Sequence, residues 1–314
     1  MKYLPPLTLK QKYYRGIEDA INAALRAVIY GPLLKSFKDD ESELFNSDNA
    51  LLDAIRSGSI WWDDGKFSGQ FNAQTTKALR ALGATYNAAS KTWALPRDRL
   101  TGDLLMAQAH ADMRYDAIRR SFLTTLDDMR IDSLDNYLHF APKYEEAIAW
   151  MDEDFQKTVR AITIEPKLTP KSQQIIARDW AQNLDLYVKD WAAENILKLR
   201  QQVQANTFDG RRPEQLFDML RANYGVSQRK AEFLARQETS LLLSKFRENR
   251  YAEIGITSYR WSTSHDERVR HDHRELNNKV FNFSQPPVTD HRTGARNNPG
   301  EDFNCRCAAI PIVD

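Results

Sequence analysis

The sequence is poor in cysteine and has no long apolar segment. It contains two cysteines, Cys305 and Cys307, among 314 residues. No run of about 18 apolar residues is present, so no segment is expected to span a bilayer. The start, Met1 to Pro6, has one lysine with no apolar stretch after it and does not resemble a secretory signal. Because two cysteines separated by one residue cannot bridge each other without strain, we expect a reducing compartment.

The chain also lacks an excess of charge of either sign. It has 44 Lys and Arg against 43 Asp and Glu, which gives a formal net charge of +1. Such a balance does not attract nucleic acid or an acidic membrane to the chain as a whole. Contact with DNA would therefore need a local basic patch, and no membrane partner is expected. The hydrophobic content of 42% is sufficient for a packed core.

The pattern of apolar residues changes along the chain and predicts an α+β fold class. The N-terminal two-thirds is mostly helical with a small inserted module, and a small C-terminal α+β domain with short strands follows. We predict four segments: an N-terminal helical arm (1–40), a small α/β module (41–101), a helical bundle region (102–205) and the C-terminal domain (206–314). A polar break at 206–212 marks the last boundary.

Helical periodicity predicts several long helices. The first is expected to end or kink at Gly31-Pro32. A helix of up to ~30 residues, or ~45 Å, follows Thr169-Pro170, which has the signature of an N-cap followed by proline. Further on, a short helix closed by Gly225 should precede a second one capped by Ser227. The apolar stripes predicted to face the core are Ala111, Tyr115, Ile118, Phe122, Leu126 and Met129; Tyr144, Ile148, Met151, Phe155 and Val159; and Ile176, Trp180, Leu184, Tyr187 and Trp191.

The inserted module and the C-terminal domain carry the predicted strands. In the module we expect a helix over 75–82 that ends at Gly83, and a hairpin over 86–96. Trp61, Trp62 and Phe67 form either the core of the module or, if exposed, an anchor for a protein interface. In the C-terminal domain the segments 257–262, 280–283 and 308–313 read as short strands.

Metal-ligating residue types are concentrated near the C-terminus. Three of the six histidines lie between 265 and 273, and both cysteines follow at 305 and 307. Thiolates and imidazole suit zinc, so we expect a zinc site made by His273, Cys305, Cys307 and Asp266, with His265 or His271 as alternatives to Asp266. Since alternate residues of an extended strand point to opposite faces, both thiols reach one metal only if the backbone turns at Arg306.

Two other interpretations of this segment stay open. The thiols could pack as small hydrophobes beside a hydrogen-bonded histidine, or serve a redox role. Alternatively, His271–Arg274 with Asn297, Asn298 and Asn304 could form a metal-dependent nuclease site, in which histidine activates water and a cation holds phosphate. No pair of carboxylates at a recognised metal spacing and no glycine-rich phosphate loop accompanies these residues.

Charged residues in the segment predict local ion pairs. Arg270 follows Asp266 at the i,i+4 spacing of a helix, so these two side chains are expected to pair. Arg306, between the two cysteines, is expected to point into the domain and pair with a carboxylate.

From residue 235 to residue 307 the chain resembles the phage head morphogenesis family, the Mu F-like minor head proteins. Ala235–Thr239 is similar to the helix motif of the family, with Gln237 at a position that is usually threonine, and Asn277-Asn278 replaces a more usual Asp-Gly turn. Other matching parts are Gly255-Ile256, Leu276 and Pro299-Gly300. The residues of the family motif are Trp261, Asp266, Arg270, His273, Asn304, Cys305, Arg306 and Cys307.

The resemblance implies a non-enzymatic component of the virion. Such proteins are thought to associate with the portal protein, the major capsid protein or both, and to act in head assembly, DNA packaging or DNA delivery. The expected location is the phage head, with the host cytoplasm as the place of assembly. The alternatives are a metal-dependent nuclease that uses the His/Asp/Asn/Cys cluster, and a protein that binds double-stranded DNA and is ejected with the genome.

Overall fold

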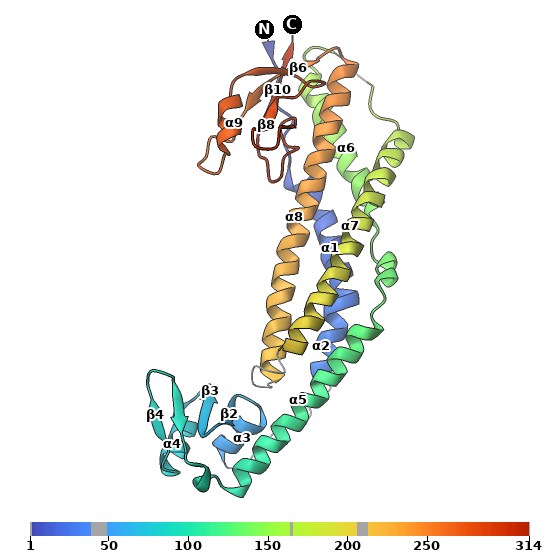
Figure 1. The fold of residues 1–314 in the computed structure, drawn as a ribbon. Helices are drawn as coiled ribbons and strands as arrows, with labels where there is room; N and C mark the ends of the chain where they lie inside the picture. Colours follow the sequence, from blue (N-terminus) through green and yellow to red (C-terminus); the bar gives the residue numbers. More distant parts are fainter. Residues whose placement is uncertain (1, 39–48, 164–165, 206–212, 314) are drawn as a thin grey trace. The chain divides into compact units, whose positions relative to one another are not determined.

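The computed structural model describes residues 2–38, 49–163, 166–205 and 213–313 (Figure 1). Its secondary structure confirms the α+β class. The helices are α1 (Gln11–Leu25), the π-helical turn η1 (Arg26–Tyr30), α2 (Gly31–Lys38), α3 (Ala50–Arg56), α4 (Ala73–Ala81), η2 (Arg97–Arg99), α5 (Gly102–Asp128), η3 (Ile131–Asn136), α6 (Phe140–Val159), α7 (Pro170–Ala205), α8 (Pro213–Glu253) and α9 (His271–Leu276). The strands are β1 (Lys2–Tyr3), β2 (Ile60–Asp63), β3 (Lys66–Gly69), β4 (Thr85–Asn87), β5 (Thr92–Ala94), β6 (Ser258–Ser262), β7 (Val280–Asn282), β8 (Val288–Asp290), β9 (Ala295–Arg296) and β10 (Ala308–Val313).

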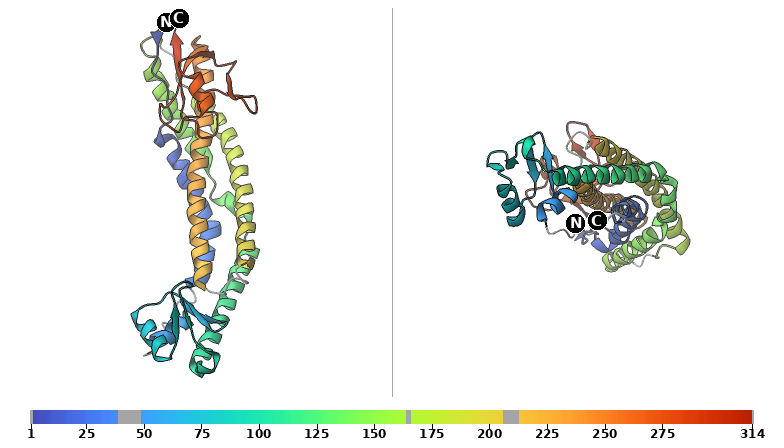
Figure 2. Two further views of the ribbon diagram at one scale, coloured as in Figure 1. Left: turned by 60° about the vertical axis from the view of Figure 1, so that its left-hand side comes forward. Right: turned by 90° about the horizontal axis from the view of Figure 1, so that it is seen from below.

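The C-terminal strands form an antiparallel sheet in the order β1-β10-β6-β7. Strands were predicted at 257–262, 280–283 and 308–313, and β6, β7 and β10 confirm them. Along β6, Tyr259 and Trp261 are buried and their neighbours are half-buried, because successive side chains of a strand face opposite sides. The pairing of β1 with β10 explains why the two chain ends lie together in both views of Figure 2.

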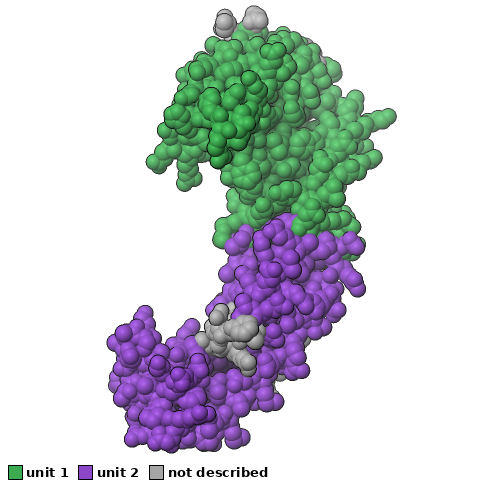
Figure 3. All heavy atoms as spheres, viewed as in Figure 1, with its two compact units in different colours: residues 1–24, 133–190, 227–314 green, residues 25–132, 191–226 purple. Residues whose placement is uncertain are grey.

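The chain divides into two compact units (Figure 3). Unit 1 comprises residues 1–24, 133–190 and 227–314, and unit 2 comprises residues 25–132 and 191–226. Each of the four predicted segments is one continuous stretch of the chain. Each unit, in contrast, consists of stretches that are separated in the sequence. Helices α7 and α8 each contribute residues to both units. The polar break predicted at 206–212 lies outside the described residues.

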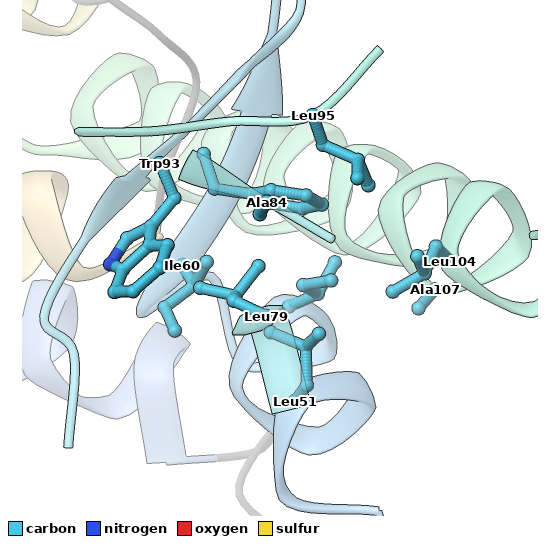
Figure 4. Close-up of a cluster of buried hydrophobic side chains, with 10 residues drawn as sticks. Leu51, Ile60, Leu79, Ala84, Trp93, Leu95, Leu104 and Ala107 are labelled. Atoms are coloured by element: carbon cyan, nitrogen blue, oxygen red, sulfur yellow. The ribbon is translucent and has the colours of Figure 1, made fainter. Parts of the chain in front are cut away.

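In unit 2, the inserted module has a four-stranded sheet in the order β2-β3-β5-β4. The predicted helix is α4, and Gly83 follows it with a positive φ of 81°. The predicted hairpin is the antiparallel pair β4 and β5. Phe67 lies in the module core, while Trp61 and Trp62 are half-buried. The start of α5 completes this core, shown in Figure 4, with Leu104 and Ala107.

The helical path does not end at Gly31-Pro32, but the regular α-helix is interrupted directly before it, where an end or a kink was predicted. Gly31 donates its N–H to the carbonyl of Arg26, five residues back, and the chain passes through the π-helical turn η1 into α2. A wider turn accommodates a proline because one regular i→i−4 hydrogen bond is given up there. A Cβ at position 31 would lie 2.7 Å from the Arg26 carbonyl oxygen, so glycine is needed for this close approach.

Helix α7 confirms the predicted long helix, but its predicted buried face is wrong. Tyr187 is 51% exposed, and Trp180 and Trp191 are half-buried. Of the predicted stripe, Leu184 is buried. Small side chains let neighbouring helices approach closely, and the large aromatic rings then lie beside the contact face. The residues that face the core along α7 are Ala177, Ala181, Leu184, Val188, Ala192, Leu199 and Val203.

The predicted break at Gly225 and the cap at Ser227 are also wrong, because α8 runs without interruption from Pro213 to Glu253. A glycine inside a helix costs about 1 kcal/mol relative to alanine, which is small against the burial of several large apolar side chains. Leu216 and Leu220 are buried before Gly225, and Ala231 and Leu234 are buried after it. Tertiary packing on both sides therefore keeps the helix continuous.

The other two predicted stripes are confirmed. On α6, Tyr144, Ile148, Met151, Phe155 and Val159 are fully buried. On α5, Met129 at the end of the predicted stripe is half-buried. The other residues of that stripe are buried as predicted: Ala111, Tyr115, Ile118, Phe122 and Leu126. Within the described part of the chain, no helix is long and apolar enough to cross a membrane.

The buried carboxylate Asp154 ties the N-terminal segment of unit 1 to α6. Lys10 Nζ lies 2.6 Å from its Oδ2, and the hydroxyl of Tyr13 donates a hydrogen bond to the same oxygen. Burial raises the pKa of Asp154, but the hydrogen bonds from Lys10 and Tyr13 outweigh it, so the pKa is lowered overall. These contacts favour the ionised carboxylate in the folded state.

We therefore expect unit 1 to lose stability in acid through Asp154. A carboxylate with a lowered folded pKa stabilises the fold above its unfolded pKa of about 3.9, and this contribution is lost as the pH falls through the folded value. Urea unfolding of wild type and Asp154→Asn across that range measures it. The variant should be less stable at neutral pH and should depend less on pH, while substitution of the exposed Asp179 on α7 should change neither property. Equal pH dependence in Asp154→Asn and wild type would contradict this role.

Candidate metal centre

His273 is placed by the short helix α9, directly after the strand β6. The residue is 2% exposed. The plane of its ring is inclined by 75° to the buried indole of Trp261, with ring centroids 5.5 Å apart. The indole of Trp261 therefore covers one side of the imidazole, and the two nitrogens of His273 face polar groups. Both residues belong to the predicted family motif, and the structure brings them into contact.

The two cysteines approach one nitrogen of that ring. Cys305 Sγ lies 3.7 Å and Cys307 Sγ lies 3.6 Å from His273 Nδ1. The backbone of Asn304 has a positive φ of 57°, and the N–H of Cys307 folds back to Cys305 Sγ at 3.4 Å. Both thiols therefore face the same side of the loop, and the three donor atoms all lie within 4.8 Å of one another.

Asp302 faces the other nitrogen of His273. Its Oδ2 lies 3.2 Å from Nε2, and Asn297 Nδ2 donates to its Oδ1 at 2.7 Å. Burial lowers the pKa of His273, but Asp302 and Cys305 raise it more, to about 9. Burial raises the pKa of Asp302, yet the histidine contact holds it below its usual range. The two residues are 29 positions apart in the sequence (302 − 273), and only the fold places Asp302 behind His273.

The two thiols differ in their ionisation. A hydrogen bond from the Cys307 thiol lowers the pKa of Cys305, and His273 lowers it further against the effect of burial. The same hydrogen bond, together with burial, raises the pKa of Cys307. Cys305 is therefore the more readily ionised thiol of the pair, and it faces the imidazole.

The predicted fourth ligand, Asp266, lies apart from this cluster. Asp266 forms a bidentate ion pair with Arg306. Arg306 Nη1 lies 2.5 Å from Asp266 Oδ2, and Nη2 lies 2.7 Å from Oδ1. The Arg306 hydrogen bond is the main cause of the lowered pKa of Asp266. Arg306 thus pairs with a carboxylate as predicted, but its side chain is 47% exposed, so the prediction that it points into the domain is wrong. The predicted pair of Asp266 with Arg270 is wrong, since Arg270 donates to the carbonyl of Phe303 at 2.6 Å.

The alternative histidine ligands also lie elsewhere. His271 is exposed on α9, next to Asp272 and Glu275. His265 lies against the hydroxyl of Thr263 at 3.5 Å. Of the candidate ligands, the structure therefore brings together His273, Cys305 and Cys307.

A polar stripe on α8 holds the loop that carries the cysteines. Gln237 accepts from the N–H of Asn304 at 2.9 Å and donates to the carbonyl of Glu301 at 3.4 Å. Ser240 donates to the carbonyl of Gly300 at 2.8 Å. The stripe, defined as Gln237, Ser240, Ser244 and Arg247, was missed in the sequence. Its signal is the helical spacing of polar residues on a face that is otherwise apolar.

The end of the stripe is the buried cation Arg247. Its guanidinium donates to the carbonyl of Pro299 at 2.5 Å and to that of Leu7 at 3.4 Å, so it joins the loop to the N-terminal segment. Burial lowers its pKa. Gly300 has a positive φ of 98°, and a Cβ there would lie 3.1 Å from both Arg247 Nη2 and Ser240 Oγ. The close approach of loop and helix therefore requires glycine.

The asparagines considered for a nuclease site serve as structural groups. Asn298 Nδ2 donates to the carbonyl of Phe283 at 3.0 Å. The side chain of Asn304 accepts from Arg236, and its backbone is held by Gln237. Asn297 holds Asp302. These side chains are engaged in contacts that shape the loop.

This region is a small α+β domain with an antiparallel sheet, in which a Cys-x-Cys loop faces a histidine of α9 and is bound to a long helix. Residues 197–310 match the family model described as Phage Mu protein F like protein. This match confirms the resemblance of the region to the Mu F-like phage head morphogenesis proteins.

One curated relative also matches part of the chain. A stretch of 90 residues is 42% identical to an uncharacterized protein of Haemophilus influenzae. The stretch covers 28% of this chain and 19% of the relative, so the match spans about a fifth of that protein. No solved structure matches the chain.

Proposed function

We propose that this protein is a non-enzymatic minor head protein of a tailed phage. It associates with the portal vertex and acts in head assembly, DNA packaging or DNA delivery. The family match at residues 197–310 supports the coarser part of this proposal, a role in phage head morphogenesis. The finer part rests on how the motif residues are used.

The observation that carries the proposal is the contact between two parts of the family motif. Gln237, in the Ala235–Thr239 helix motif, binds the backbone of Asn304 and of Glu301 in the loop that leads to the cysteines. Asp266 and Arg306, forty positions apart, neutralise each other. The amide of Gln237, the carboxylate of Asp266 and the guanidinium of Arg306 are thus occupied in closing the domain. Such use is typical of a structural component rather than of an enzyme.

The partners follow from this role. The portal protein, the major capsid protein or both are the proposed protein partners. Double-stranded DNA is a further proposed ligand inside the head, and because the net charge of +1 provides little general attraction, this contact needs a local basic patch. The proposed place of action is the virion, after assembly in the host cytoplasm.

The test is the protein content of phage particles. We expect peptides of this chain in procapsids and virions purified from the host that encodes it, at a small fraction of the major capsid protein. Quantitative mass spectrometry measures this, with peptides of the portal protein as the internal control for intact vertices. Absence from both kinds of particle, while portal peptides are present, would contradict the proposal.

A second assay separates this role from nuclease activity. The full chain is incubated with supercoiled plasmid and Mg²⁺, Mn²⁺ or Zn²⁺, and we expect the plasmid to stay intact. Cutting that disappears in His273→Ala, but persists in a variant of the exposed His271, would replace the structural proposal with an enzymatic one.

A further inference from the structure

We propose that His273, Cys305 and Cys307 bind one zinc ion, with a water molecule as the fourth ligand. The ion would link α9 to the loop before β10 and so close the C-terminal domain. The inference rests on the geometry of the three side chains and does not depend on the proposed role in the phage head.

The distances between the donor atoms suit tetrahedral zinc. With Zn–S bonds of about 2.3 Å and Zn–N bonds of about 2.0–2.1 Å, a sulfur and a nitrogen ligand lie about 3.5–3.6 Å apart at a tetrahedral centre. The sulfurs of Cys307 and Cys305 lie 3.6 and 3.7 Å from His273 Nδ1. The donor atoms therefore need to move little to enclose the ion.

Hydrogen bonding alone accounts poorly for this arrangement. Nδ1 of an imidazole carries either one hydrogen or one lone pair, directed in the plane of the ring. It can therefore make one well-aligned hydrogen bond, yet the two sulfurs of Cys305 and Cys307 are almost equally distant from it. A single cation between the sulfurs satisfies all three donors at once.

Asp302 supplies the outer contact that zinc-binding histidines usually have. A histidine ligand commonly donates its second ring N–H to a carboxylate, which orients the ring and increases its basicity. Asp302 Oδ2 lies 3.2 Å from His273 Nε2, on the side away from the sulfurs, and Asn297 holds the other carboxylate oxygen. The carboxylate is 9% exposed, so it is screened from competing solvent.

The ligand set and the adjacent cavity agree with this assignment. Two thiolates and an imidazole favour zinc over the hard ions Mg²⁺ and Ca²⁺, and two thiolates balance its charge. Both cysteines line a cavity of about 270 Å³ formed with α8 and the segment around Leu9 and Gln11. A water molecule needs far less space, so the cavity can hold the fourth ligand.

The experiment measures metal in the full chain. Protein purified without chelator and dialysed to remove loose ions should contain one zinc per chain by elemental analysis. The double variant Cys305→Ser/Cys307→Ser should contain none. The control His271→Asn changes an exposed histidine on the same helix and should retain the metal. Asp302→Asn keeps all three ligands and should bind zinc about 10–100-fold more weakly.

A second readout covers the case in which the double variant does not fold. Cobalt(II) exchanged into the wild-type chain should give sulfur-to-metal charge-transfer absorption in the near ultraviolet and the strong visible bands of a four-coordinate site. Wild-type protein that gives no such spectrum and no stoichiometric zinc, even after refolding with excess zinc, would overturn the proposal. Stoichiometric binding of a different metal in place of zinc would also overturn it.

Discussion

Replacing Asp152 by alanine is expected to lower the free energy of unfolding of unit 1 by about 3 kcal/mol. Asp152 on α6 and Arg250 on α8 form a buried ion pair, with Oδ1 and Nη2 separated by 3.2 Å and side chains 2% and 5% exposed. Removing one member leaves the other charge buried and unpaired, which costs more than the loss of the attraction itself. Glu253, which also contacts Arg250, reduces the loss because it remains in place.

The neighbours of this pair add to its cost. Asp152 Oδ2 accepts from the N–H of Leu168 at 3.0 Å, and Arg250 donates to the carbonyl of Pro166 at 2.8 Å. The Arg250 guanidinium also lies 4.8 Å from the ring centre of Phe155. The pair therefore helps to position the chain segment that leads into α7, and removing the Asp152 carboxylate leaves the N–H of Leu168 and part of the Arg250 guanidinium without this partner.

Urea denaturation followed by circular dichroism measures the effect. The matched control is Glu153→Ala, which changes the next residue and breaks an exposed pair with Lys157. This control should unfold like wild type, because exposed ion pairs contribute little. If Asp152→Ala and Glu153→Ala have the same unfolding midpoint, the buried pair does not stabilise the fold as argued.

The second large effect is expected for Trp261→Ala, at about 3–5 kcal/mol. Trp261 is fully buried at the centre of the C-terminal sheet, opposite Ala309 of β10. Its indole contacts the rings of His273 and Phe281. Truncation removes a large buried surface and leaves a cavity beside the imidazole, so the packing that orients His273 is also lost.

Hydrogen exchange measured by mass spectrometry locates this effect. In Trp261→Ala, peptides from β6, α9 and β10 should exchange faster than in wild type, while peptides from the inserted module in unit 2 should keep their rates. Val280→Ala on β7, where the side chain is 51% exposed, is the control and should change the rates little. Equal protection of the C-terminal strands in Trp261→Ala and wild type would show that the indole is not needed for the packing around His273.

Elements with a strong local signal were predictable from the sequence. The stripe from Tyr144 to Val159 repeats at helical spacing, and all five of its predicted residues are buried. The alternating segment at 258–262 forms β6, and the turn residues before Thr92 form a hairpin. In each case the period of the pattern and the turn chemistry act over a few residues, so neighbours along the chain are sufficient to determine the outcome.

Features that depend on distant packing were not predictable. The aromatic residues of α7 suggested a buried face, but small residues such as Ala177 and Ala181 form the contact because helices approach most closely there. Gly225 suggested a helix end, yet packing before and after it keeps α8 continuous. Asp266 was assigned to Arg270 by helical spacing, whereas Arg306, far along the chain, takes it.

The sequence by itself determined the α+β class, the C-terminal resemblance to the Mu F-like family, and the residue types gathered in the candidate site. Only the tertiary structure decided which of these residues meet. It placed Asp302 behind His273, set Asp266 apart with Arg306, and fastened the cysteine loop to α8 through Gln237 and Arg247. The physical reason is that these contacts join residues distant in sequence, and their formation depends on backbone positions set by the packing of the whole domain.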